Sequence, residues 1–97
     1  MAEMADPTTH RREVLLRLTQ GLHIRACSRV VALVSNYPGD VIIHNGERKA
    51  DARSMFDLVQ LAAFPGTLLQ IEANGDKAID ILDGLEALLS READPST

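Results

Sequence analysis

The sequence predicts an α+β fold: a two-layer sandwich with the element order β-α-β-β-α-β-α. Three observations support this prediction. Segments with apolar residues at every second position alternate with segments in which they recur every three or four positions. Asn45-Gly46, a strong hairpin signal, stands between two short strand-like segments. Four strands and three helices within about 80 residues favour two layers, with a largely antiparallel sheet that helices cover on one face.

A strand and a helix are predicted first. Val14, Leu16 and Leu18 recur at every second position, which predicts a strand with one buried face. From Ile24 the period becomes helical, and residues 36–39, Asn-Tyr-Pro-Gly, provide a stop signal. The apolar face of this helix comprises Cys27, Val30, Val31 and Val34.

A hairpin and a short helix are predicted next. Residues 41–44 form one strand, and residues 47–50 form a polar return strand at an edge of the sheet. Asn45-Gly46 joins them in a type I′ turn, which needs positive φ at both positions. Ser54 then precedes a short helix, where its hydroxyl accepts from the first free amides and Asp57 is favourable in the first turn.

The last elements are a strand and a helix. Phe64-Pro65-Gly66 is read as a turn, and residues 67–73 alternate again. Asn74-Gly75-Asp76 then opens the final helix. Its apolar stripe comprises Ala78, Ile79, Ile81, Leu82, Leu85, Leu88 and Leu89, and its acidic residues are read as a solvated face.

The composition excludes several classes of protein. The chain has 97 residues and is expected to form one domain over residues 13–91, between loose tails at residues 1–12 and 92–97. A single cysteine, Cys27, excludes an intrachain disulfide framework and a cysteine-rich metal site. No apolar run is long enough to span a membrane. A net charge of −4 argues against a free-standing nucleic-acid binder.

The most informative segment is Gly21-Leu22-His23-Ile24-Arg25, at the predicted junction of strand and helix. The free amides and the positive dipole end of a helix favour an anion at this place. Arg25 adds a guanidinium suited to phosphate oxygens. The segment therefore suits a histidine that accepts a phosphoryl group, although a histidine at a helix start is more often only a capping or surface residue.

The order and spacing of several short motifs resemble the HPr family, the histidine-containing phosphocarriers of the bacterial phosphoenolpyruvate:sugar phosphotransferase system. These motifs are Gly-Leu-His-x-Arg after the first strand, the Asn45-Gly46 hairpin, Arg53-Ser54-Met55-Phe56, Gly66-Thr67 and the final helix. The resemblance covers residues 13–91. It implies an open-faced β-sandwich, with four antiparallel strands under three helices.

The resemblance also implies a relay. His23 would take a phosphoryl group on Nδ1 from phosphorylated enzyme I and pass it to an A-type acceptor domain of an enzyme II. Arg25 would neutralise the phosphate. Ser54 would be the target of an HPr kinase/phosphorylase that uses ATP. The expected docking residues are Ile24, Ser28, Met55 and Phe56. The chain would be a monomeric cytoplasmic phosphocarrier and not an enzyme in its own right, with no cofactor and no metal.

This chain departs from the family pattern at several positions. Ala26 stands where the family usually has proline, and the exposed face of the first helix offers one charge, Arg29, where relatives often carry lysines. Two alternatives therefore stay open. One is a regulatory module in which the state of Ser54 or His23 controls a kinase, a transporter or a transcription factor without sugar-uptake flux. The other is a small-ligand-binding module that shares only the architecture.

Overall fold

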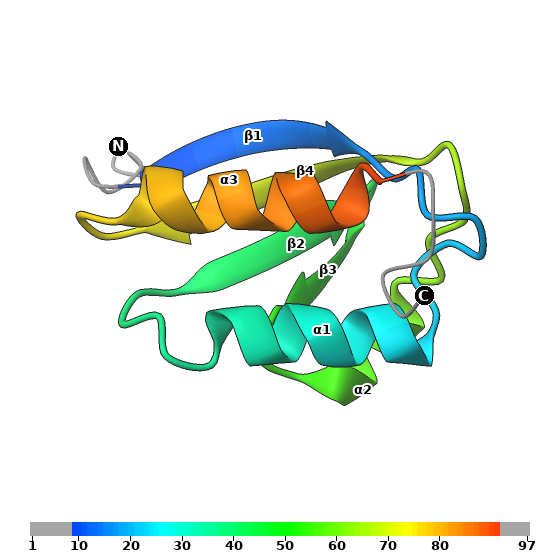
Figure 1. Ribbon diagram of the computed structural model, residues 1–97, viewed down its shortest axis with the longest axis horizontal. Coiled ribbons are helices and arrows are strands. Elements are labelled where there is room, and N and C mark those ends of the chain that lie inside the picture. The colour runs from blue at the N-terminus through cyan, green and yellow to red at the C-terminus, as the bar shows by residue number, and fades with distance from the viewer. Residues whose placement is uncertain (1–8, 92–97) are drawn as a thin grey trace.

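The computed structural model describes residues 9–91, and within them the order of elements is the predicted one (Figure 1). The strands form one antiparallel sheet with the order β1-β4-β2-β3. The fold class, an open-faced sandwich of four strands and three helices, is therefore confirmed. The elements are β1 (Thr9–Leu15), α1 (Ile24–Val34), β2 (Val41–Asn45), β3 (Arg48–Asp51), α2 (Met55–Gln60), β4 (Leu68–Asn74) and α3 (Ala78–Leu89).

Strand β1 begins earlier than the sequence predicts. It starts at Thr9, so assigning residues 9–12 to a loose tail was wrong. These residues are polar and give no apolar signal, but their backbone pairs with β4 from Thr9 opposite Asn74. Arg12 also forms ion pairs with Asp83 at 2.5 Å and Glu86 at 3.1 Å on α3. The rest of the two predicted tails, residues 1–8 and 92–97, lies outside the described residues.

The apolar alternation of the first strand continues past its end. Val14, Leu16 and Leu18 are all buried, as predicted, although β1 ends at Leu15. Leu16 stays tied to the chain before β4, because its amide donates to Thr67 O at 2.8 Å and its carbonyl accepts from Gly66 N at 2.8 Å. After β1 the chain thus leaves the sheet, but the side chains of Leu16 and Leu18 stay in the core.

The predicted hairpin is present, but its turn lies one residue further along. Asn45 pairs with Arg48, so Gly46 and Glu47 occupy the turn. Only Gly46 has positive φ, at 62°, and the type I′ assignment to Asn45-Gly46 was therefore wrong. The reason is tertiary: the Asn45 side chain donates to Leu61 O at 2.9 Å, which keeps this residue in the strand.

The core between the sheet and the helices is mostly aliphatic, and Tyr37 is the aromatic residue in it. It draws on every element, including Ile43 from β2, Ile71 from β4 and Leu85 from α3. Cys27 is fully buried, and this burial raises the pKa of its thiol to about 11, so the thiolate is scarce at neutral pH. Over residues 9–91, no helix is both long and apolar enough to span a bilayer.

Candidate functional site

His23 is the N-cap residue of α1, and its ring closes the first turn of that helix. Its backbone is extended, with φ −82° and ψ 176°, and its Nδ1 accepts from the amides of Arg25 at 3.1 Å and Ala26 at 3.4 Å. A ring nitrogen that accepts carries a lone pair, so this geometry assigns the proton to Nε2. The nitrogen that faces the free amides of the helix is thus the unprotonated, nucleophilic one.

The loop before α1 is held in place by the loop after α2. The amide of Leu22 donates to Ala63 O at 3.0 Å, and Leu22 is buried. Gly21 has a φ of +70°, and a Cβ at this position would lie 2.7 Å from Ala63 O. Both facts require glycine here. Two segments far apart in the chain therefore fix the backbone that presents His23.

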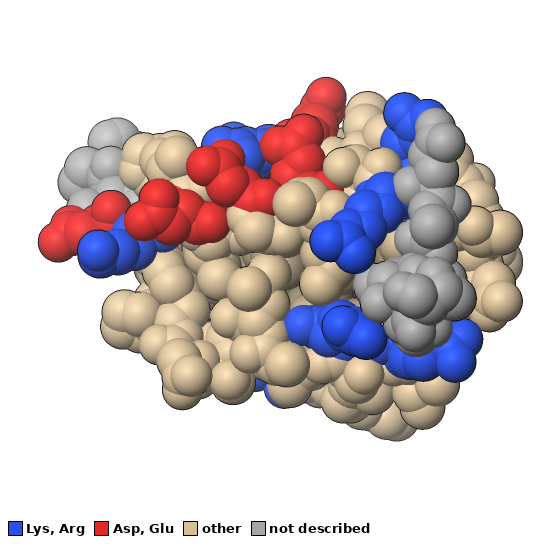
Figure 2. Space-filling model, in the orientation of Figure 1, with Lys and Arg blue, Asp and Glu red and all other residues tan. Residues whose placement is uncertain are grey.

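The surroundings of His23 favour an anion. The first turn of α1 contains no acidic residue, and Arg25 and Arg29 on this helix are both exposed. Figure 2 shows Lys and Arg side chains gathered over the N-terminal part of α1, while Asp and Glu side chains gather over α3. A chain with a net charge of −4 thus carries a basic region at the end that holds His23.

Large apolar side chains are exposed on the segments next to His23. Ile24 is 68% exposed and Phe56 70%, whereas Met55 is only partly exposed and packs against the core. Of the two apolar residues on α2 that are expected to dock partners, Phe56 is therefore the more accessible. Ser28 is exposed too, and its hydroxyl donates to Arg25 O at 2.8 Å.

Phe64 is an exposed aromatic residue that sequence reasoning missed. It was read only as part of a turn, yet it is 70% exposed, and its Cα lies 3.2 Å from the Cβ position of Gly21. It therefore stands beside the loop that presents His23. A large aromatic residue within a turn, in a chain with 3% aromatics, was the available signal.

Ser54 caps α2 as predicted. Its hydroxyl accepts from the amide of Asp57 at 3.1 Å, and its side chain is half-buried. The carboxylate of Asp57 accepts from Asp51 N at 3.3 Å, and that of Asp51 from Arg53 N at 2.9 Å. The guanidinium of Arg53 donates to the carbonyls of Tyr37 and Gly39. The turn around Ser54 therefore contains two carboxylates, while the side chain of the preceding residue, Arg53, bonds the loop between α1 and β2.

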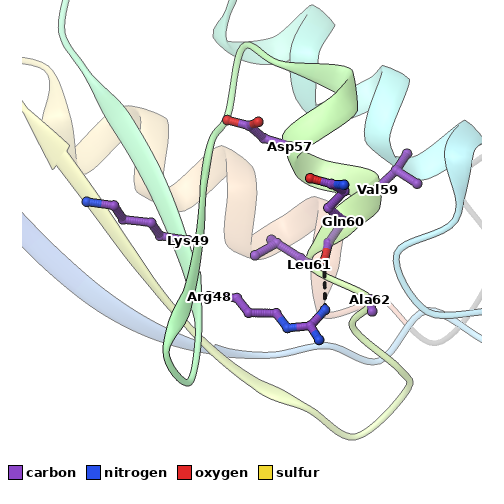
Figure 3. Close-up of a pocket in the computed structure, with 7 residues that line it drawn as sticks. All are labelled: Arg48, Lys49, Asp57, Val59, Gln60, Leu61 and Ala62. Carbon is purple, nitrogen blue, oxygen red and sulfur yellow. Dashed lines mark hydrogen bonds between the residues drawn. The ribbon is translucent and has the colours of Figure 1, made fainter.

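A hollow of about 600 Å³ lies between β3 and α2 (Figure 3). It is lined by Arg48, Lys49, Asp57, Val59, Gln60, Leu61 and Ala62. Figure 3 shows the guanidinium of Arg48 bonded to the carbonyl of Gln60, at 3.0 Å. Neither His23 nor Ser54 lines this hollow.

Another titratable cluster lies on the sheet. His44 on β2 is half-buried, and its Nε2 lies 2.7 Å from Glu72 Oε1. Arg11 pairs with the same carboxylate at 2.8 Å. The pKa of Glu72 is lowered by the hydrogen bond with His44 and by the charge of Arg11, against the opposing effect of burial. Among residues 9–91, no three His, Cys, Asp or Glu side chains group in a way that could hold a metal ion.

Comparison with known proteins places this geometry in context. A family model described as "PTS HPr component phosphorylation site" matches residues 10–91. Among curated proteins, phosphocarrier protein NPr of Shewanella violacea is 30% identical over 86 residues, which cover 89% of this chain and 94% of that protein. Phosphocarrier protein HPr of Haemophilus influenzae is 30% identical over 78 residues, which cover 80% of this chain and 92% of the relative.

Solved structures agree on the fold. The crystal structure of phosphocarrier protein HPr from Bacillus anthracis superposes with a TM-score of 0.79 at 23% identity, over 84% of this chain and 96% of that one. The match extends over nearly all of the described residues, so the whole domain and not one motif shares the architecture.

Proposed function

The chain belongs to the HPr family of phosphocarrier proteins of the phosphotransferase system, and from this premise we propose that His23 is its phosphoryl acceptor. A phosphocarrier is a relay that other proteins load and unload, and it does not turn over a small substrate alone. We further propose phosphorylated enzyme I as the donor, an A-type acceptor domain of an enzyme II as the recipient, and the cytoplasm as the location.

A single observation carries the proposal: Nδ1 of His23 accepts from two amides in the first turn of α1. The lone pair of this nitrogen attacks phosphorus, and the Nδ1–P bond forms as the bond between phosphorus and the donor breaks. The electron pair of the broken bond leaves with the donor, and Nε2 of His23 keeps its proton. Free amides, the helix dipole and the Arg25 guanidinium then offset the charge of the phosphoryl oxygens. The same steps in reverse load the acceptor.

The docking surface in this proposal surrounds His23. It comprises Ile24, Ser28, Met55, Phe56 and, in addition, Phe64. The exposure of Ile24, Phe56 and Phe64 supports an apolar centre, since exposed apolar patches mark interaction sites and aromatic side chains are enriched in protein interfaces. Arg25 and Arg29 support a partner with acidic groups at the rim of the contact.

Ser54 is the proposed regulatory site within the same function. Phosphorylation there would add a dianion to a turn that already contains Asp51 and Asp57, next to the exposed Phe56. An acidic partner would then be repelled from the docking surface. This supports a switch that slows the loading of His23 without unfolding the domain.

Intact mass after incubation with enzyme I and phosphoenolpyruvate tests the proposal, with His23→Ala as the matched control. We expect the parent chain to gain one acid-labile phosphoryl group and the variant to gain none. If the parent gains nothing with enzyme I from its own genome, the carrier proposal is wrong. The regulatory alternative centred on Ser54 then takes its place.

A further inference from the structure

Ala26 contributes a backbone amide that the helix itself does not use. It is the third residue of α1, where an N–H has no intrahelical acceptor. In this structure the amide donates to Nδ1 of His23 at 3.4 Å, next to the amide of Arg25 at 3.1 Å. The imidazole of His23 is therefore the acceptor for the amide of Ala26 in this structure.

The two amides differ in their access to water. Ala26 has 0% exposure, whereas Arg25 is exposed. When Nδ1 forms a bond to phosphorus, its lone pair is consumed and it can no longer accept from either amide. A buried N–H that loses its acceptor and cannot reach water is costly, so another acceptor must take its place. The atoms brought to this position by the reaction are the phosphoryl oxygens.

We propose that the backbone amide of Ala26 binds the phosphoryl group on His23 and thereby raises the share of phosphate that this carrier holds at equilibrium with its donor. The inference rests on the proposed function, because it needs His23 to be phosphorylated. In the unphosphorylated protein the amide of Ala26 donates to a neutral ring nitrogen. In the phosphorylated protein the same amide donates to an anionic oxygen. Charge-assisted hydrogen bonds are the stronger class, so the exchange favours the phosphorylated state.

The size of this effect follows from the difference between the two hydrogen bonds. The amide of Ala26 has an acceptor in both the unphosphorylated and the phosphorylated state. The equilibrium therefore depends only on how much stronger the hydrogen bond to the anionic oxygen is. We expect roughly a fivefold shift in the equilibrium, since charge-assisted bonds are about twice as strong as neutral ones. A residue without an N–H at position 26 would lose this gain, and proline is the one genetically encoded residue that lacks it.

Ala26→Pro removes this N–H at a position where a helix tolerates proline, because no intrahelical bond is lost. Proline also restricts the preceding residue, so a second variant is needed. An ester bond in place of the amide between Arg25 and residue 26 deletes the N–H and leaves the side chains unchanged. Cys27 immediately follows, so a synthetic segment of residues 1–26 can be ligated at the native cysteine. The same ligation with the native amide between Arg25 and Ala26 keeps the N–H and is the matched control.

The experiment mixes phosphorylated parent protein with an equal amount of each unphosphorylated variant and a catalytic amount of enzyme I. The parent is uniformly labelled with nitrogen-15, so that intact mass separates it from each variant, the ester variant included, and gives the share of phosphate on each chain. We expect the proline and ester variants to hold roughly five times less phosphate than the parent at equilibrium, and the ligated protein with the native amide to match the parent.

The outcomes separate this inference from the proposed function. If the parent itself cannot be loaded with phosphate, the proposed function is wrong and the inference falls with it. If the parent loads and the ester variant shares phosphate equally with it, the carrier function stands and the role of the Ala26 amide is disproved. A shift in the proline variant without one in the ester variant also disproves it, because the backbone restriction would then be the cause.

Discussion

Helices α1 and α2 begin in the same way and differ in what surrounds their first turns. Each starts after an extended residue whose side chain accepts from free amides: His23 through Nδ1 and Ser54 through its hydroxyl. Helix α1 has 11 residues and no acid in its first turn, whereas α2 has 6 residues, with Asp57 in the first turn and Asp51 bonded to it.

The difference in nearby charge matters because a capping side chain and a bound anion need different surroundings at the start of a helix. A capping side chain satisfies free amides in either helix, whatever the charge nearby. An anion also needs the positive end of a helix dipole with no carboxylates beside it. The start of α1 meets this condition, and Arg25 strengthens it. At α2 the carboxylates of Asp51 and Asp57 oppose an added negative charge, so a phosphate at Ser54 would act on partners by repulsion.

The largest expected effect comes from adding charge to the start of α2. Ser54→Asp should slow the phosphorylation of His23 by enzyme I by roughly tenfold or more, through repulsion of an acidic partner. Aspartate is a good N-cap residue, so the fold should be kept. Initial rates by intact mass measure this effect. Ser54→Asp with Asp57→Asn should recover part of the rate, and a full rate in the single variant would refute charge-based regulation.

A smaller effect is expected from trimming the apolar residues beside the two helix starts. Phe64→Ala should lower kcat/KM for phosphorylation by roughly fivefold, which corresponds to the loss of about 1 kcal/mol that marks an important interface residue. Final loading and thermal stability should be unchanged, since the side chain is 70% exposed. The exposed Leu68 offers a matched control in Leu68→Ala. Equal losses in both variants would argue against a contact at Phe64.

The smallest effect concerns capping alone. Ser54→Ala should lower the free energy of unfolding by about 0.5–1 kcal/mol, because the amide of Asp57 loses its acceptor. The phosphorylation rate should stay at the parental value, because no charge is added. Urea unfolding and the loading assay, run on the same preparation, measure the two quantities. A slower rate without added charge would mean that the hydroxyl of Ser54 itself contacts the partner.

Local patterns were sufficient to predict most of the elements and the places of His23 and Ser54 at the starts of two helices. The helical period from Ile24, the cap at Ser54 and the position of His23 at the start of α1 all depend on residues within a few positions of one another. Such signals are readable because helix capping and side-chain periodicity act over one or two turns. The hairpin was found for the same reason, although its turn was placed one residue early.

The tertiary structure decided what depends on segments far apart in the chain. Strand β1 begins at Thr9 because the backbone of β4 pairs with it, and no apolar pattern at residues 9–12 announces this. Asn45 stays in β2 because its side chain reaches the carbonyl of Leu61. Phe64 joins the surroundings of His23 because the loop after α2 packs on Gly21. The amino-acid sequence alone determined the periods, the caps and the choice of His23 as the proposed nucleophile. Register and exposure, including the burial of Ala26, arise only when distant segments meet, because their energies depend on partners that short-range patterns do not contain.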